Sequence, residues 1–203
     1  MAERFRGAPL PDEAALVMSA RAGERAAFDR LAEHHRVWLE RTAALMVGDA
    51  EPAEDLVQEA FRIALEQGAA FEGRSAFSTW LCGIVLNLCR RELRRRTRDG
   101  GSVDPSQLDQ EEATAAAQHG PLSSVLRREL GARIDNAVAR LPIPLREGFL
   151  LRFVSGLDYE EIAAASGVTV ATARVRAFRA RALLRAELGG MVDSVWLEGE
   201  SEG

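Results

Sequence analysis

The chain has 203 residues, which is enough for one ordinary domain or two small ones. With 47% hydrophobic and 28% charged residues, its composition is that of a soluble globular protein and not of a disordered one. No stretch of 18 apolar residues occurs, and residues 1–15 lack the apolar run of a signal peptide. We therefore expect a cytoplasmic protein without membrane insertion.

The net charge of −5 is unevenly distributed along the chain. Residues 99–125 hold five acidic and no basic residues, and residues 191–203 hold four acidic and none basic. Residues 126–190 hold 11 arginines against seven acidic residues. Every basic residue is arginine, the side chain best suited to bidentate contacts with phosphate. The acidic total therefore does not exclude nucleic-acid binding by the C-terminal folded part.

Cysteine and histidine give no sign of a metal site. Cys82 and Cys89 are seven residues apart on one predicted helix, too far for a disulfide, so we expect two free core thiols. His34, His35 and His119 share no metal-ligand spacing with them. No paired carboxylates, nucleophile–base set or phosphate loop stands out. We expect no metal, no cofactor and no enzymatic activity.

Residues 12–98 are predicted to form a helical domain. Apolar residues at helical spacing predict these helices: Glu13–Ala22, Glu24–Val47, Ala53–Gln67, and one that begins at Ser75 or Ser78 and ends near Arg98. The last helix is apolar in its first half. Its second half carries six arginines: Arg90, Arg91, Arg94, Arg95, Arg96 and Arg98. Such a cluster can present a rigid set of donors to a phosphate backbone, although a solvated charged helix end has the same pattern.

Two further features of this half are open to more than one interpretation. Asp55, Gln58, Glu59 and Arg62 form a polar stripe on the third helix, which by spacing alone is ordinary solvated surface. The connection Phe71–Arg74 can be a base-capture loop with an exposed ring. Alternatively, Phe71 packs back on the core as a hydrophobic staple.

Residues 126–190 are predicted to form a second helical domain. The predicted helices are Leu126–Leu141, one from Pro142 through Val154, Tyr159–Ser166 with a capping-box-like start at Asp158, and Val170–Leu188 capped by Thr169. The last two, joined by a tight turn at Gly167, have the pattern of a DNA-binding helix-turn-helix. We thus expect an all-α protein of two small domains joined by a flexible acidic linker, residues 99–125. The acidic tail, residues 191–203, is expected either to be disordered or to fold back on the basic final helix.

Residues 26–61, 71–96 and 141–184 together resemble the extracytoplasmic-function sigma factors, the minimal members of the bacterial sigma-70 class. The segments DLVQEAF and FEGRSAFSTWL carry the most specific part of this resemblance. It implies a region 2 helical bundle and a region 4 helix-turn-helix. It also implies these partners: the clamp helices and flap of core RNA polymerase, promoter DNA, and an anti-sigma factor.

The resemblance assigns roles to individual positions. Docking on core polymerase falls to Asp55, Leu56, Gln58 and Glu59. Binding of the minus-10 element falls to Phe71, Gly73, Arg74, Ser75, Asn87, Arg90, Arg91 and Arg94. Reading of the minus-35 element falls to Thr169, Val170, Ala171, Thr172, Arg174, Arg176 and Arg179. Asn87, Arg90, Arg91 and Arg94 are also neighbours on one helical face by spacing alone.

The chain departs from the family pattern at several positions. Cys82, Gly83 and Leu86 stand where many relatives have an aromatic residue and two arginines, which reduces the positive charge of the strand-opening helix. In the recognition helix, Ala173 and Ala177 replace larger core residues, and Phe178 stands where a polar residue is common. We therefore expect the second domain to be looser, rotated in its packing, or completed by a partner.

The alternative function is that of a stand-alone helix-turn-helix regulator. Such a regulator needs a dimer interface to match two half-sites on DNA. The sequence has no long heptad segment to supply one, so we expect a monomer when the protein is free.

Overall fold

The computed structural model describes the backbone of residues 10–68, 71–98 and 121–189, and the side chains of these ranges except 121–130. All regular structure in these ranges is helical. The helices are α2 (Glu13–Arg21), α3 (Arg25–Val47), α4 (Ala50–Glu66), α5 (Phe77–Arg98), α6 (Pro121–Arg140), α7 (Ile143–Phe149), the π-helical turn η3 (Leu150–Val154), α8 (Tyr159–Ser166) and α9 (Val170–Leu188). The prediction of an all-α fold with two helical regions is confirmed.

Local capping explains why the helix-turn-helix elements end where predicted. Asp158 and Glu161 form a full capping box at the start of α8. Gly167 ends that helix with a φ of 69°, a conformation that costs other residues more. The Thr169 side chain then accepts a hydrogen bond from the Thr172 amide and starts α9.

Several helix boundaries differ from those expected. The helix α4 begins at Ala50, three residues early, because the Asp49 side chain caps it by accepting from the Glu51 amide. The helix α5 begins at Phe77, and Ser78 lies buried inside it. The helix α6 begins at Pro121, within the segment that we expected to be linker. The single helix expected through Val154 divides into α7 and η3.

The first helical region is held together by buried faces of α3, α4 and α5. Leu31 and Leu39 from α3, Val57 from α4 and Leu81 and Val85 from α5 are fully buried. Full burial of a side chain of this size contributes roughly 1.5–3 kcal/mol. Both cysteines of α5 are also buried and free, as expected, and burial raises the pKa of the Cys89 thiol to about 12.

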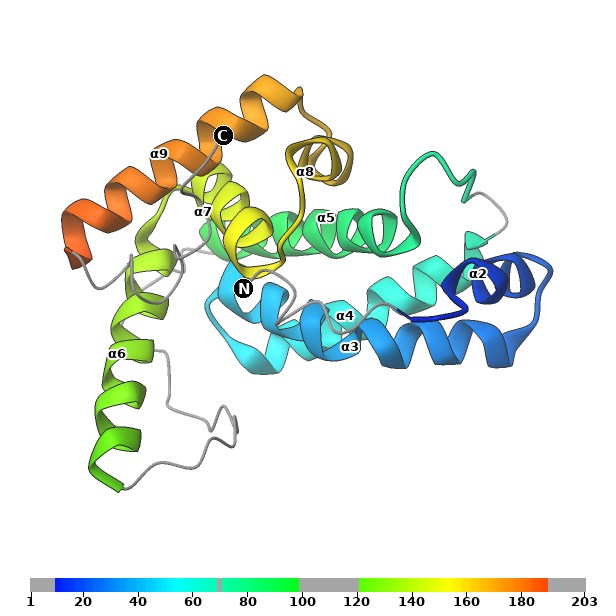
Figure 1. Cartoon of the computed structure of the whole chain (residues 1–203), viewed down its shortest axis with the longest axis horizontal. Coiled ribbons are helices and arrows are strands. Elements are labelled where there is room, and N and C mark those ends of the chain that lie inside the picture. Colours follow the sequence, from blue (N-terminus) through cyan, green and yellow to red (C-terminus); the bar gives the residue numbers. More distant parts are fainter. Residues whose placement is uncertain (1–9, 69–70, 99–120, 190–203) are drawn as a thin grey trace.

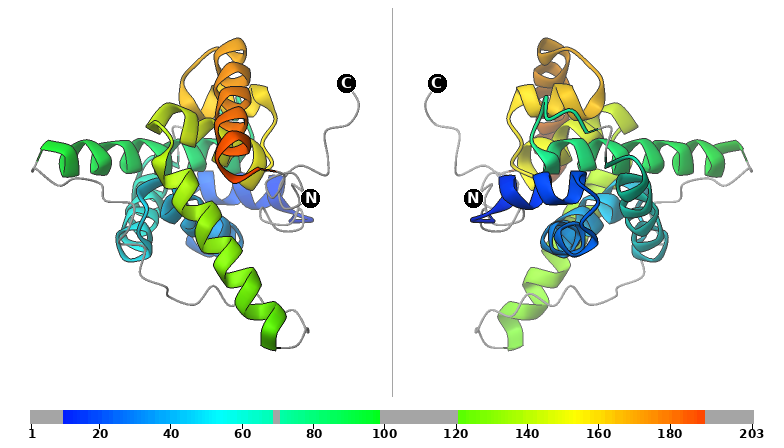
Figure 2. Two further views of the ribbon diagram at one scale, coloured as in Figure 1. Left: turned by 90° about the vertical axis from the view of Figure 1, so that its left-hand side faces the viewer. Right: turned by 90° about the vertical axis from the view of Figure 1, so that its right-hand side faces the viewer.

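The two helical regions pack against each other. Figures 1 and 2 show α8 and α9 on the side of α5 that faces away from α4, while the N-terminal end of α6 projects from the body. One continuous cluster of buried apolar residues runs through both regions. A Cβ atom at Gly83 of α5 would lie 3.1 Å from the carbonyl oxygen of Ala165 in α8. The absence of a side chain at Gly83 thus permits this close approach. The predicted linker, residues 99–120 of it, lies outside the described residues.

Where α7 meets α9, the packing of the second region is close and not loose; loose packing was one of the three alternatives expected for it. Ala173, Ala177 and Ala180 of α9 are fully buried, and a Cβ at Gly148 of α7 would lie 2.9 Å from the Cβ of Arg176. Small residues on both helices therefore let α7 and α9 approach closely. The close approach thus takes up volume that larger residues would otherwise fill.

Candidate nucleic-acid interface

The polar stripe of α4 lies on the surface of the first region. Asp55 and Gln58 are exposed, and Leu56 and Glu59 are partly exposed. Arg62 bridges Glu59 and Glu66 along the same face, with 2.6 Å between its guanidinium and each carboxylate. The hydrogen bond from Arg62 lowers the pKa of Glu59. This face is therefore charged, ordered and open to a partner.

The loop before α5 is anchored by a buried aromatic ring. Phe71 is only 5% exposed and packs edge-on against Phe77 and beside Trp80, with ring centroids 5.7 Å and 5.1 Å away. The ring is thus not exposed for base stacking, and the hydrophobic-staple alternative describes its contacts. Gly73 follows with a φ of 73°, and Arg74, exposed, pairs with Glu72. Ser75, partly exposed, donates a hydrogen bond to the Ala76 carbonyl.

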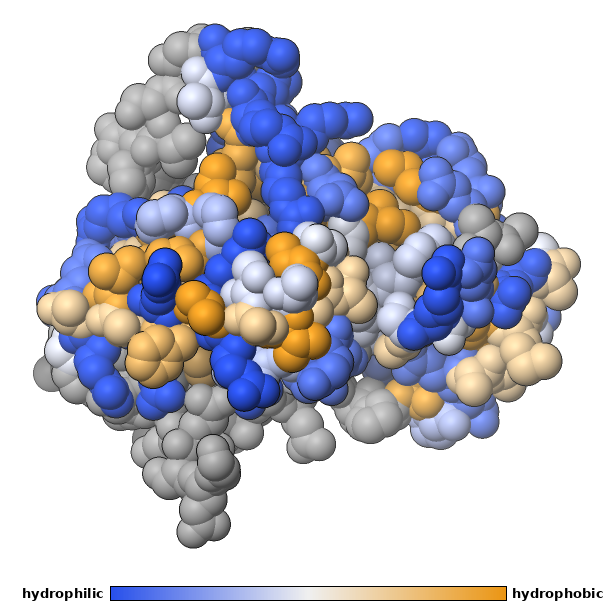
Figure 3. Space-filling view, turned by 90° about the horizontal axis from the view of Figure 1, so that it is seen from above, coloured by the Kyte–Doolittle hydropathy of each residue, from blue (hydrophilic) through white to orange (hydrophobic). Residues whose placement is uncertain are grey.

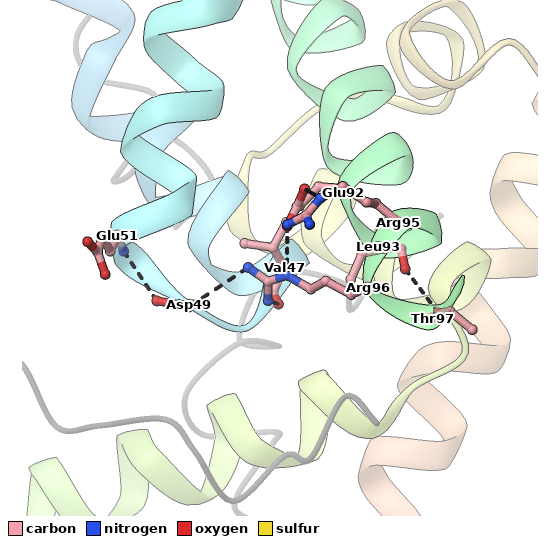
Figure 4. Close-up of polar contacts among 8 residues, drawn as sticks. All are labelled: Val47, Asp49, Glu51, Glu92, Leu93, Arg95, Arg96 and Thr97. Atoms are coloured by element: carbon pink, nitrogen blue, oxygen red, sulfur yellow. Dashed lines mark hydrogen bonds and ion pairs between the residues drawn. The ribbon is translucent and has the colours of Figure 1, made fainter. Parts of the chain in front are cut away.

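The end of α5 uses two of its arginines to hold the fold. Glu92 accepts hydrogen bonds from Arg95 and Arg96, the nearest at 2.8 Å and 2.9 Å (Figure 4). Arg96 also reaches the carbonyl oxygen of Val47 at 3.3 Å and the carboxylate of Asp49 at 3.8 Å. Arg96 therefore caps the C-terminal end of α3, and Arg95 is bound by Glu92, so both cations are less available to an outside anion. The two guanidinium groups lower the pKa of Glu92 to about 2.

The four predicted strand-binding residues of α5 lie in two environments. Arg91 and Arg94 are exposed, and Asn87 is exposed beside Arg90. Arg90 is instead directed at the second region. It donates to both carboxylate oxygens of Glu147 in α7, at 2.9 Å and 2.6 Å, and to the Ser166 carbonyl at the end of α8, at 3.2 Å. A third nitrogen donates to the Asn87 side chain at 2.8 Å.

Other polar contacts tie the two regions together along the same boundary. We call this boundary the domain seam: the contacts of α3 and α5 with α7, η3 and α8. Thr79 donates to Glu161 at 3.1 Å, and the hydroxyls of Thr42 and Ser155 are 3.2 Å apart. Arg146, which is buried, donates to the Met46 carbonyl at 2.6 Å. The domain seam is therefore held by defined hydrogen bonds as well as by apolar contacts.

The helix α9 presents most of its predicted duplex-reading residues to the surface. Ala171, Arg174 and Arg179 are exposed, while Val170, Thr172 and Arg176 are partly exposed. The hydroxyls of Thr169 and Thr172 are 2.8 Å apart. The first turn of α9 therefore offers small and polar groups, and arginines follow along the helix. That combination suits a helix that enters a major groove.

Three residues that shape this site have no contact role predicted from the sequence. Glu147 is almost fully buried and pairs with Arg90, and Gly83 allows α8 to approach α5. The Tyr159 ring lies under two guanidinium groups, those of Arg152 at 4.9 Å and Arg174 at 5.1 Å. An acidic residue inside an apolar helix, LREGFLL, is a local signal that could have pointed to Glu147. The partner of that acid could not be read from spacing.

No helix among the described residues is long and apolar enough to cross a membrane.

Two known protein families match the chain over the helical regions described above. Residues 31–99 match the family described as sigma-70 region 2, and residues 131–184 match sigma-70, region 4.

Individual relatives match over most of the chain. The RNA polymerase sigma-H factor of Pseudomonas aeruginosa is 35% identical over 170 residues, which cover 82% of this chain and 88% of that protein. The ECF RNA polymerase sigma-E factor of Escherichia coli K12 is 34% identical with the same coverage.

Solved structures show a similar arrangement. The complex of CnrH with the cytosolic domain of CnrY contains a chain that matches with a TM-score of 0.64 and 28% identity, covering 87% of this chain and 96% of that one. The sigma factor RpoE of Bartonella quintana, in complex with the anti-sigma factor NepR, matches with a TM-score of 0.57 and 26% identity. That match covers 88% of this chain and 98% of the other.

Proposed function

This chain belongs to the extracytoplasmic-function (ECF) group of sigma-70 family RNA polymerase sigma factors, and we propose that its two helical regions divide promoter recognition between them. A sigma factor directs promoter-specific transcription initiation by the core enzyme and is not itself an enzyme. Region 2, residues 12–98, docks on core polymerase and opens the minus-10 element. Region 4, residues 126–190, reads the minus-35 element as duplex. Residues 99–125 link the two, and residues 191–203 form an acidic tail.

The observation that carries this division is the geometry of α8 and α9. The tight turn at Gly167 sets a short helix against a longer one whose outer face carries arginines. A helix so exposed reads duplex DNA, with Thr169, Val170, Ala171, Thr172, Arg174, Arg176 and Arg179 as the contacting residues. This reading needs no second copy of the chain, because polymerase positions the helix.

Region 2 supplies the remaining contacts. The exposed stripe of α4, with Asp55, Leu56, Gln58 and Glu59, meets the clamp helices of core polymerase. Gly73, Arg74 and Ser75 hold the flipped base of the minus-10 element, and the buried Phe71 anchors their loop. The melted strand then runs along Asn87, Arg90, Arg91 and Arg94. The protein works in the cytoplasm, where core polymerase and the chromosome are.

We assign the closed arrangement of the two helical regions to the resting state of the free factor. Arg90 is bound to Glu147, so it cannot contact DNA until the seam opens. Core polymerase, by holding region 2 on its clamp helices and region 4 on its flap, separates the two and frees this face. The free factor is a monomer, and it binds an anti-sigma factor, as does the similar sigma factor RpoE that forms a complex with NepR. We assign to this partner the role of keeping the two regions closed.

Reconstituted transcription with purified core polymerase tests the proposal. The wild-type chain is compared with Asp55→Ala/Gln58→Ala and with Glu54→Ala, an exposed acidic residue beside the four predicted docking residues but not among them. We expect the double variant to lose core binding and transcripts while Glu54→Ala keeps both. A wild-type chain that neither binds core nor starts transcripts from any genomic fragment would refute the proposal. Binding of a promoter fragment at physiological salt without polymerase would favour a stand-alone regulator.

A further inference from the structure

A groove crosses the second region and continues onto the domain seam. One hollow of about 420 Å³ lies between the start of α7 and the outer side of α9, and a second of about 390 Å³ lies between α5, α7 and the α8–α9 turn. Both are lined by Pro144 and Arg176, so they join into one surface. We call it the seam groove.

The seam groove is positively charged from both helical regions. Arg94 of α5 lines its far end, and Arg176 and Arg179 of α9 line its middle and near end. The only acidic side chain among the lining residues is Glu147, which Arg90 neutralises. The groove therefore favours an anionic occupant.

The seam groove also has an apolar part. A phosphate backbone would make no apolar contacts there, so this part indicates a different occupant. Val175 lines the groove and is 47% exposed, and Phe178, one helical turn further along α9, is 71% exposed. Figure 3 shows apolar side chains among the hydrophilic ones over the part of the surface that α9 occupies. An exposed aromatic residue beside an apolar hollow indicates a site for apolar side chains. The best occupant is thus an acidic segment with apolar residues in its middle.

Residues 191–203 of this chain have that composition. Val195, Trp196 and Leu197 lie together, flanked by Asp193 on one side and by Glu198, Glu200 and Glu202 on the other, with no basic residue. Their sequence follows directly after α9, whose last cap, Gly189, has a φ of 62° and ψ of −152°. Such a conformation suits glycine and turns the chain away from the helix axis.

The length of the segment permits it to reach the groove. Val175 lies 13 residues before the last residue of α9, about 20 Å along the helix at 1.5 Å per residue. The seven residues from Gly190 to Trp196 span up to about 23 Å when extended. We propose that residues 191–203 dock in the seam groove, with the Val195–Leu197 cluster against Val175 and Phe178 and the acidic residues facing Arg94, Arg176 and Arg179.

This contact would be autoinhibitory. A docked segment covers Arg176 and Arg179, which the proposed function assigns to duplex reading, and it joins both sides of the seam. The docked segment would thus have two effects at once: it would hold the two helical regions in the closed arrangement, and it would block α9. The docking itself depends on no promoter and no polymerase, so it can be tested independently of the proposed function.

Peptide competition tests the docking. A fluorescein-labelled peptide of residues 190–203 is titrated with the full chain and with the full-length variant Val195→Ser/Trp196→Ser/Leu197→Ser. We expect the triple variant to bind the peptide at least about tenfold more tightly, because in the wild type the attached segment competes at high effective concentration. Equal affinity for the two chains, or no binding to either, would overturn the proposal.

Two controls locate the site. Adding Phe178→Ser to the triple variant is expected to weaken peptide binding about tenfold, and the exposed position of Phe178 means that folding is preserved. A labelled peptide of residues 101–119, which is also acidic, is expected to bind at least about tenfold more weakly. Unchanged binding after Phe178→Ser would remove the groove as the site. Tighter binding of the 101–119 peptide would show that the linker, and not the tail, is the occupant.

Discussion

Arg90 and Glu147 form a two-pronged ion pair across the domain seam, with Nε to Oε2 at 2.9 Å and Nη2 to Oε1 at 2.6 Å. The Glu147 side chain is 3% exposed and that of Arg90 is 21% exposed. Arg90 is also one of the residues proposed to hold the melted strand. The same guanidinium therefore serves either the closed arrangement or DNA, and the two uses exclude each other.

Removing one member of this pair should open the seam. Arg90→Ala leaves the buried carboxylate of Glu147 uncompensated, a change that typically costs 3–5 kcal/mol, and separation of the two regions would return the carboxylate to water. We expect the radius of gyration measured by small-angle X-ray scattering to increase. Arg91→Ala, at an exposed position one residue further on, is the matched control and should leave it unchanged. If Arg90→Ala has the same radius of gyration as Arg91→Ala and the wild type, the Arg90–Glu147 pair does not hold the seam closed.

Two glycines in helices offer a matched test of the packing between α7 and α9. A Cβ at Gly148 would lie 2.9 Å from the Arg176 Cβ and 3.0 Å from the Ala177 nitrogen, whereas at Gly131 of α6 nothing lies within 4 Å. We expect Gly148→Ala to lower the free energy of unfolding by roughly 1–3 kcal/mol. Gly131→Ala should raise it by up to about 1 kcal/mol through helix propensity. Urea denaturation measures both, and a neutral or stabilising Gly148→Ala would contradict the close approach.

Much of this architecture follows from local sequence signals. The capping box of α8, the glycine that ends it and the threonine that starts α9 each act within four residues, so the sequence predicts the bounds of α8 and α9 to the residue. The start of α5 differs from the prediction, because the helix begins at Phe77, between the two serines predicted as its possible caps. Local patterns also could not reveal the seam. In the sequence, Gly83 indicates only that a positive charge common in relatives is absent. Its role in close packing becomes visible only in the structure, where Ala165 lies against it.

The network around Glu92 predicts a pH dependence of stability. Arg95 and Arg96 lower the pKa of Glu92 from 4.5 to about 2 in the folded chain. The folded state thus holds this carboxylate ionised where the unfolded state begins to protonate it, so its stabilisation is complete above pH 4.5 and is lost as the pH falls toward 2. We expect Glu92→Gln to lower the free energy of unfolding at pH 7 by about 1 kcal/mol and to flatten its fall in this acidic window.

Urea denaturation between pH 7 and pH 3 measures this difference. Glu33→Gln is a suitable control, because Glu33 pairs with Arg36 on the exposed side of α3 and its side chain is 77% exposed. An exposed pair of this kind contributes little, so the control should follow the wild type over the whole range. If Glu92→Gln also follows the wild type, the Glu92 network does not stabilise the join between α5 and the end of α3.

The proposed division of promoter recognition predicts a different defect for each of two variants, Arg176→Ala and Asn87→Ala. Arg176 lies on the duplex-reading side of α9, so its loss should change the preferred upstream element, with about 1–3 kcal/mol less discrimination at one position. Asn87 lies on α5 beside Arg90, so its loss should leave that preference intact and slow strand opening. Run-off transcription from a randomised promoter library reports the first defect, and permanganate reactivity of the minus-10 thymines reports the second. Arg21→Ala, an exposed position in α2, should show neither. Unchanged upstream preference in Arg176→Ala together with normal strand opening in Asn87→Ala would remove these two residues from the proposed promoter contacts.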